Sequence, residues 1–278
     1  MICRTKRSGC AQRIASTRSR RSGRLLLLAL PLGAVLLLAC VARAEPPDPE
    51  VARMLERALA NAETFRKQLK SSEYDAKMRV QEWDARGRLR GTALAQAIIR
   101  PGDARPMIFV SREVQGKVRL PDDKPDKSDE DEKEVTLQEF AREHQIAERF
   151  EFTVTGSEEI AGERARRVSF RPKPKQPVKN TADRFLNTIS GTAWVSEGEN
   201  KLVKFDLKLM HPFQLFWIFA VLKDLSIEYE LITPGEILGH AKIKVLYALT
   251  TPVYSIKQLH DVDIANFRRR NAVAAARN

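Results

Sequence analysis

The chain has 278 residues, of which 43% are hydrophobic and 30% are charged, and its formal net charge is +12. Nine of its 48 basic residues lie in positions 1–44, which hold no acidic residue, so the remaining chain carries 39 basic and 36 acidic side chains. The basic excess therefore belongs mostly to the first segment. The remainder lacks the positive surplus that contacts with a phosphate backbone need, so we expect no nucleic acid partner.

Positions 1–44 have the pattern of a secretory signal peptide, because a basic region up to Arg24 precedes an apolar run over residues 25–39. The small residues Ala42 and Ala44 favour cleavage just before Glu45. Such cleavage would release the protein into the periplasm.

Other outcomes of export stay open. The residues from Leu37 to Cys40 resemble a lipobox, whose processing would leave a lipidated Cys40 and a membrane-anchored lipoprotein. Arg20 and Arg21 hint at twin-arginine export. An uncleaved anchor is the weakest alternative, since the apolar run is shorter than the ~20 residues that span a bilayer.

A chain that begins at Glu45 would have 234 residues and no cysteine, because the three cysteines are Cys3, Cys10 and Cys40. This composition excludes a disulfide framework, a thiolate nucleophile and a cysteine metal site. The length suits a single domain, which we place at residues 45–268, before a disordered basic tail at 269–278. We expect no cofactor and no metal.

A helix is predicted at the start of this domain. Asp48 and Pro49 are residue types that helix starts prefer. The apolar residues that follow recur every three or four positions and form one stripe over about six turns. The stripe consists of Val51, Leu55, Ala58, Ala62, Phe65 and Leu69.

A period of two then predicts three strands of an antiparallel meander, over residues 74–80, 94–99 and 107–110. Residues 121–134 follow with eight acidic and three lysine side chains but no aromatic or aliphatic one. Such a segment predicts a disordered loop, with a cation or partner site as the alternative. Residues 135–150 predict one short helix.

Strand patterns dominate from Phe150 onward. The predicted strands cover residues 150–154, 168–170, 192–196, 203–209, 225–231, 243–247 and 254–263, with a helical stretch at 182–189. In the strand at 203–209, Lys204, Asp206 and Lys208 should face water. Nine or ten antiparallel strands with two or three helices predict an α+β fold built on one large, curved antiparallel sheet.

The sequence shows no catalytic pattern. The four histidines lie far apart, and a lone histidine in a helix or strand is usually structural. His260, Asp261 and Asp263 form the tightest group, but strand alternation sends His260 and Asp261 to opposite faces. Because no metalloprotease, nucleophile-elbow or phosphate-loop motif is present, we expect no enzyme. A hydrolase built around His260 and Asp263 is the weakest alternative.

Residues 212–222 are apolar on every face, with Gln214 as the main exception. One interpretation is a central strand covered on both sides. The other is a lip that contacts an apolar ligand, with Met210 extending the lining. The candidate lining residues are Phe213, Phe216, Trp217, Phe219, Leu225 and Tyr229.

The order of these features resembles a known family. A signal peptide, a striped helix and a meander precede the segments 162–172, 191–195 and 203–207, whose sequences are GERARRVSFRP, GTAWV and VKFDL. This combination resembles the bacterial outer membrane lipoprotein-sorting proteins, which are relatives of the periplasmic lipoprotein carrier LolA. The resemblance covers roughly residues 50–268 and consists of strand and turn signatures.

The resemblance implies an incomplete β-barrel closed by helices, with a cavity that shelters acyl chains and with no cofactor. It implies a lipid or lipidated protein as partner, together with an outer- or inner-membrane partner. The first helix is the candidate lid, through Leu55, Phe65 and Leu69, although ordinary core packing would explain the same stripe.

The sequence therefore favours an exported cell-envelope protein that binds an apolar ligand, lipoprotein acyl chains or another lipid, as a non-catalytic carrier or sensor. The alternative is a structural or partner-binding envelope protein that uses the same sheet as a scaffold without a lipid cavity.

Overall fold

The structure is a computed structural model that describes residues 49–101, 103, 106–119, 135–216, 220–232 and 239–270. The expected signal segment with Cys40 and the expected acidic loop at 121–134 lie outside the described residues. Among the residues that are described, no helix combines the length and the apolar character needed to cross a membrane.

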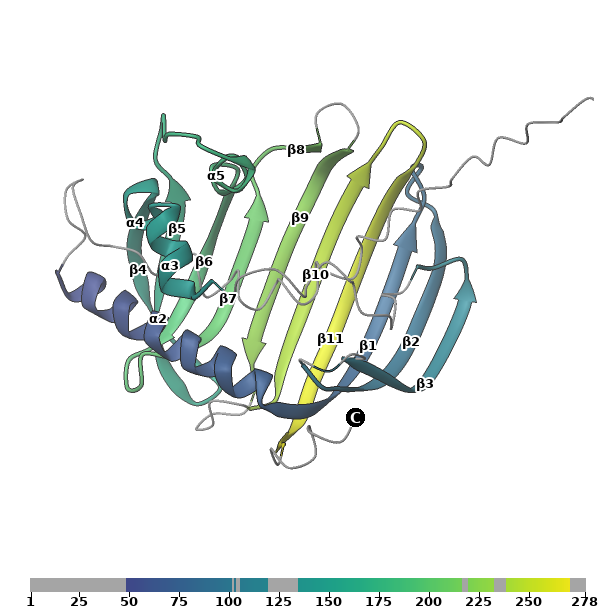
Figure 1. Cartoon of the computed structure of the whole chain (residues 1–278), viewed down its shortest axis with the longest axis horizontal. Coiled ribbons are helices and arrows are strands. Elements are labelled where there is room, and N and C mark those ends of the chain that lie inside the picture. The colour runs from purple at the N-terminus through teal and green to yellow at the C-terminus, as the bar shows by residue number, and fades with distance from the viewer. Residues whose placement is uncertain are drawn as a thin grey trace, which may run out of the picture.

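An antiparallel sheet of 11 strands forms the body of the fold (Figure 1). Its strands are β1 (Ser72–Trp83), β2 (Leu89–Ile99), β3 (Met107–Gly116), β4 (Phe150–Ile160), β5 (Glu163–Pro172), β6 (Ile189–Ser196), β7 (Leu202–Leu209), β8 (Phe213–Phe216), β9 (Ala220–Leu231), β10 (Ala241–Thr250) and β11 (Ser255–Arg269). The described helices are α2 (Pro49–Lys70), α3 (Leu137–Glu143), α4 (Ile146–Arg149) and α5 (Thr181–Leu186).

The sheet is curved but not closed (Figure 1). Its strands follow the order β3-β2-β1-β11-β10-β9-β7-β6-β5-β4, so β3 and β4 are its two edges. The prediction of a large curved antiparallel sheet is confirmed. The predicted numbers of elements were too low, since the described part of the chain has 11 strands and four helices.

Two of the helix predictions need correction. Residues 135–150 form two helices, α3 and α4, because Gln145 adopts a left-handed conformation with φ of 50° and breaks the helical path. Thr136 and Glu139 cap the first of them in a capping box. The predicted helix at 182–189 is α5, which ends at Leu186 because Ile189 already begins β6.

The last strand is longer than predicted. Strand β11 runs to Arg269, and the Arg268 guanidinium lies 3.0 Å from Glu73 and 2.6 Å from Asp75 on β1. The backbone N–H of Arg270 donates to the carbonyl of Ser71. Arg268 is therefore part of the sheet, where acidic side chains of β1 pair with it, and Arg270 just beyond β11 is held by Ser71 just before β1 and by Asp103. Residues 271–278 lie outside the described residues.

The segment at 212–222 is not a central strand. Strand β8 pairs with β9 and lies off the main path of the sheet. It forms a hairpin with the start of β9, where Phe213 lies opposite Leu222. Because the chain turns straight back onto β9, only one side of β8 has a neighbouring strand among the described residues.

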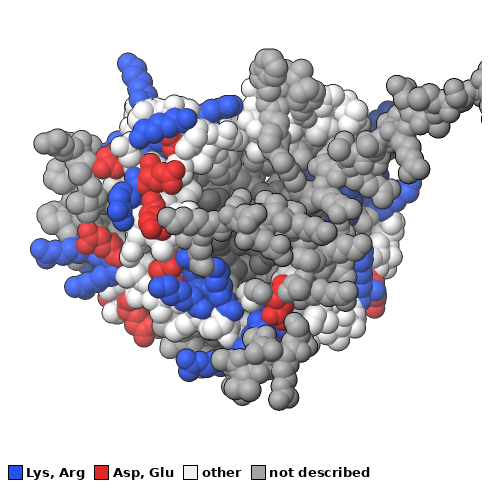
Figure 2. Space-filling model, in the orientation of Figure 1, with Lys and Arg blue, Asp and Glu red and all other residues white. Residues whose placement is uncertain are grey.

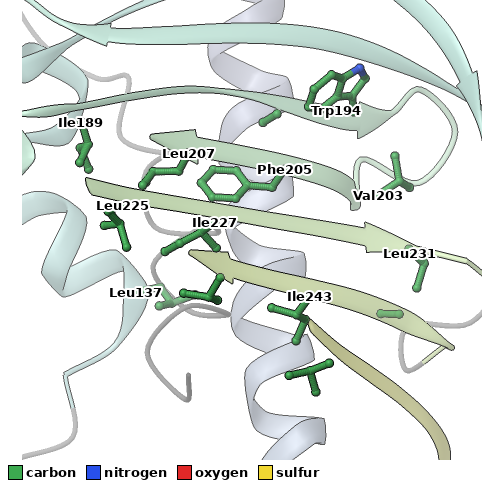
Figure 3. Close-up of a cluster of buried hydrophobic side chains, with 14 of the residues drawn as sticks. Leu137, Ile189, Trp194, Val203, Phe205, Leu207, Leu225, Ile227, Leu231 and Ile243 are labelled. Carbon is green, nitrogen blue, oxygen red and sulfur yellow. The ribbon is translucent and has the colours of Figure 1, made fainter. Parts of the chain in front are cut away.

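One face of the sheet carries the core. Alternate residues of each strand point to the side on which α2 lies, and the stripe residues Leu55 and Ala58 of α2 are buried against them. Figure 3 shows Phe205, Leu207 and Ile227 on neighbouring strands together with Leu137 of α3. In β6, a side chain at Gly191 would collide with the carbonyl of Asp206 and the ring of Phe170, so glycine lets these strands pack closely.

A buried polar network joins α3, α4 and α5. The Arg149 guanidinium lies 3.1 Å from Asp183 and donates to the Asn187 side chain at 2.6 Å, and His144 Nδ1 lies 2.7 Å from Asp183. Burial works to raise the pKa of Asp183, but hydrogen bonds from His144 and the Lys179 backbone outweigh it and lower that pKa. The helices are thus held by a charged pair that has little contact with water.

We predict that Asp183→Ala lowers the free energy of unfolding by about 3–5 kcal/mol, because Arg149 would remain buried without a counter-charge. Urea denaturation followed by circular dichroism measures this loss. Glu151→Ala is the control, since Glu151 forms an exposed pair with Arg171 and exposed pairs contribute little. Equal denaturation midpoints for the two variants would contradict the prediction.

Candidate functional site on the inner face of the sheet

The candidate site is the apolar face of the sheet, called here the inner face, which is the side that carries the helices (Figure 1). Helices α3, α4 and α5 lie over β4 to β7, whereas no described helix lies over the greater part of β11, β1 and β2. The space-filling view shows charged side chains gathered mainly over the half that carries these helices (Figure 2). The two halves of the inner face are therefore covered unequally.

The side chains of the two halves also differ in size. Under the helices the inner face presents large residues, such as Phe170, Phe205 and Leu225. On β1 and β2 the corresponding positions are mostly alanines, namely Ala76, Ala93, Ala95 and Ala97. An alanine projects a single carbon atom from the sheet, so this half of the inner face is apolar and has short side chains.

Tyr229 of β9 lies between these halves, opposite Phe205 on one side and Ile243 on the other. Burial raises the pKa of its hydroxyl strongly, yet part of the side chain stays accessible. Tyr74 of β1 is more enclosed, and burial raises its pKa to about 12.

The predicted lining residues are only partly brought together. Leu225 and Tyr229 share the inner face of β9, and Leu225 lies opposite Tyr247. Phe213 is buried against the ring of Phe185, with 5.3 Å between ring centroids.

The other predicted lining residues give no support. The side chain of Phe216 and the whole of Trp217 and Phe219 lie outside the described residues. Met210, predicted to extend the lining, is 45% exposed instead, because it follows the end of β7.

The candidate lid residues lie on one face of α2. Leu55 is fully buried, whereas Phe65 and Leu69 are partly buried. The helix is held at its middle, because the Asn61 side chain donates to the carbonyls of Glu199 and Asn200 in the β6–β7 turn at 2.7 and 3.1 Å. The Glu63 carboxylate accepts from the backbone N–H of Leu137 at the start of α3.

A buried polar cluster, the β1–β11 cluster, lies on the inner face where its apolar surface ends. Gln258 donates to Glu82 at 2.8 Å, and its amide oxygen accepts from His260 at 2.9 Å and from the Tyr247 hydroxyl. Glu82, Tyr247, Gln258 and His260 are all buried. Burial lowers the pKa of His260 to about 4, so the ring is neutral at pH 7.

The β1–β11 cluster was not predicted from the sequence, although the position of Glu82 indicates it. Glu82 continues the inward alternation of Tyr74, Ala76, Met78 and Val80. A carboxylate at the end of such a series indicates a buried polar partner on a neighbouring strand. That the partner would be Gln258 depends on the pairing of β1 with β11.

The opposite face of the sheet, the outer face, holds a groove of about 1040 Å³ that crosses the strands from β3 to β6. Charges of opposite sign alternate along it from strand to strand, as in the series Arg79, Asp261, Lys244 and Glu228. Opposite charges on neighbouring strands stabilise a sheet. Burial raises the pKa of Asp206 in this groove, and the neighbouring Glu228 adds to the effect.

The histidines do not form a catalytic group. His260 and Asp261 lie on opposite faces, as predicted, and Asp263 instead pairs with His240 at 2.8 Å. His144 is part of the buried network with Asp183. Among the described residues, no three histidine, cysteine or acidic side chains are grouped so that they could hold a metal ion.

The pKa of His260 predicts a pH-dependent stability. Its folded-state pKa of about 4 lies below the ordinary 6.5, so the unfolded chain takes up the proton first. The stabilisation is complete above pH 6.5 and is lost as the pH falls towards 4. Between pH 7 and pH 5 we expect a loss of about 2 kcal/mol that His260→Gln removes. Urea midpoints at both pH values test this, and an equal slope in both proteins would refute it.

Comparison with known proteins finds similarity among solved structures only. No protein-family model matches the chain, and no curated protein matches it. Among solved structures, a LolA superfamily protein from Nitrosomonas europaea is 11% identical, with 79% of this chain and 93% of that chain covered and a TM-score of 0.27.

An outer membrane lipoprotein-sorting protein domain from Vibrio parahaemolyticus is 11% identical, over 78% of this chain and 94% of that chain, with a TM-score of 0.28. The Pseudomonas aeruginosa MucA/MucB complex matches at 10% identity, over 79% of this chain and 99% of that chain, with a TM-score of 0.24.

Proposed function

We propose that the protein is an exported cell-envelope protein that binds an apolar ligand, lipoprotein acyl chains or another lipid, as a non-catalytic carrier or sensor. The observation that carries this proposal is the unequal inner face. Its β1–β2 half is lined by alanines without a described helix over most of it, next to the partly accessible Tyr229. Such an elongated apolar surface can accommodate an extended acyl chain.

The energetics of this proposal are favourable. Transfer of one acyl chain of about 16 carbons from water to an apolar surface contributes on the order of 10 kcal/mol, at ~0.8 kcal/mol for each buried CH₂. No bond needs to be made or broken for such binding. Asn61 and Glu63 attach α2 to the β6–β7 turn and to the start of α3 by a few hydrogen bonds. So small a number suits a helix that moves aside when ligand enters or leaves.

A second function has a specific observation in its favour. Edge strand β3 exposes Ile108, Val110 and Val114, and Val110 is 64% exposed. An exposed apolar edge strand is a surface on which another protein can add a strand. A partner-binding envelope protein would use this edge and would need no ligand on the inner face.

Recovery of the protein from its native envelope tests the proposal. Intact mass spectrometry should give a chain that begins at Glu45, and extraction should release lipid in a stoichiometric amount. A mass with a lipidated Cys40 would indicate a membrane-anchored form instead. A chain without extractable lipid, recovered in complex with a protein, would favour the second function.

Two substitutions on β2 separate ligand binding from folding. Ala95→Phe places a large side chain on the inner face and should abolish co-purification of lipid, because it fills the space along the alanines. Gln96→Phe adds the same side chain to the outer face one position later and should leave lipid binding unchanged. Equal lipid contents in the two variants, at equal thermal stability, would contradict an inner-face site.

A further inference from the structure

The apolar inner face of β1, β2 and β11 ends in a group of polar residues. Along β1 the inward positions are apolar up to Val80, and Glu82 follows. Along β11, read in the opposite direction, Val262 is followed by His260 and Gln258. Any chain that lies along the alanines of β2 therefore has the β1–β11 cluster at one of its ends.

Two glycines let the chain that follows β3 pass close to the β1–β11 cluster. Gly91 of β2 lies opposite Gly116 of β3, and a Cβ on Gly91 would lie 2.6 Å from the carbonyl of Gln115. Gly116 has φ of +74°, which favours glycine. The chain turns here, and the backbone N–H of Lys117 donates to the carbonyl of Arg90.

The buried cluster holds the backbone of Arg119. The N–H of Arg119 donates to Glu82 Oε2 at 2.9 Å, and the Gln258 side chain donates to the Arg119 carbonyl at 3.0 Å. The guanidinium stays exposed and lies 5.1 Å from the centre of the Tyr254 ring. The buried side chains of Glu82 and Gln258 thus fix the main chain of Arg119, while its guanidinium is exposed beside the Tyr254 ring.

Among the described residues at this end, one of the two arginines has an acidic partner and the other has none. The Glu82 carboxylate lies 3.3 Å from Arg90 and has its other oxygen occupied by Gln258 and the Arg119 backbone. Arg119 has no acidic partner within the described part of the chain. Because His260 is neutral at pH 7, Arg119 is the cation that lies without a carboxylate beside it among the described residues of this end.

We propose that Arg119, with Arg90 beside it, binds the anionic head group of an amphiphile whose acyl chain lies along the alanines of β1 and β2. The inference rests on the proposed function and narrows its ligand to amphiphiles with a carboxylate or phosphate head. Arginine suits both groups, because its planar fork of N–H donors matches their oxygen atoms.

The test compares two probes with the same acyl chain, cis-parinaric acid and its methyl ester, whose fluorescence rises on transfer to an apolar site. The delipidated mature protein should bind the acid about tenfold more tightly than the ester, the effect of one charge-assisted hydrogen bond. Arg119→Gln should remove this preference and leave the affinity for the ester unchanged. Arg171→Gln, an equal charge change on distant β5, should keep the preference.

The outcomes distinguish this inference from the proposed function. Equal affinities for acid and ester in the unmodified protein would overturn the head-group site and leave an apolar carrier in place. Equal losses of preference in Arg119→Gln and Arg171→Gln would also overturn it, because net charge would then explain the preference. Failure of both probes to bind would overturn the proposed function itself.

Discussion

The pairing of the first strand with the last strand is the constraint on which the rest of the structure depends. Strand β1 pairs with β11 over its whole length, from Ser72 opposite Arg269 to Trp83 opposite Lys257. This ladder joins the β1–β3 meander to the strands that follow the helices. Without it, the described chain would have two separate sheets, and neither would have a continuous inner face.

The same ladder decides what lies on each face. It places Glu82 beside Gln258 on the inner face and Arg79 beside Asp261 on the outer face. Since strand residues alternate between faces, a shift of the register by one residue would send the inner apolar set to solvent. The buried polar cluster and the alternating outer charges both favour the observed register, because other registers would leave charges buried or unpaired.

The inner face then combines two kinds of surface. One half is filled by large side chains under helices that the buried Arg149–Asp183 pair holds together. The other half has short, apolar side chains and is bounded by arginines at one end. The proposed ligand would lie along the half whose side chains are small, beside the half that the large side chains fill.

Local patterns were enough to predict most elements. Helix α2, the β6–β7 hairpin and the inward alternation of β1 all follow from the spacing of apolar residues. The opposite directions of His260 and Asp261 follow from alternation as well. Predictions failed where a single backbone conformation intervened, as at Gln145, or where partners far along the chain were needed, as for Arg268 and β8.

By itself, the sequence determined an antiparallel α+β domain with one apolar face, because the period of apolar residues is a local property of the chain. It also determined that the basic excess and the cysteines belong to the first 44 residues. Only the tertiary structure decided which strands are neighbours, that α3, α4 and α5 cover one half of the inner face, and that Glu82 and Gln258 hold the backbone of Arg119. The Glu82–Gln258 contact joins residues 176 positions apart, and no spacing within a single element specifies such a pair.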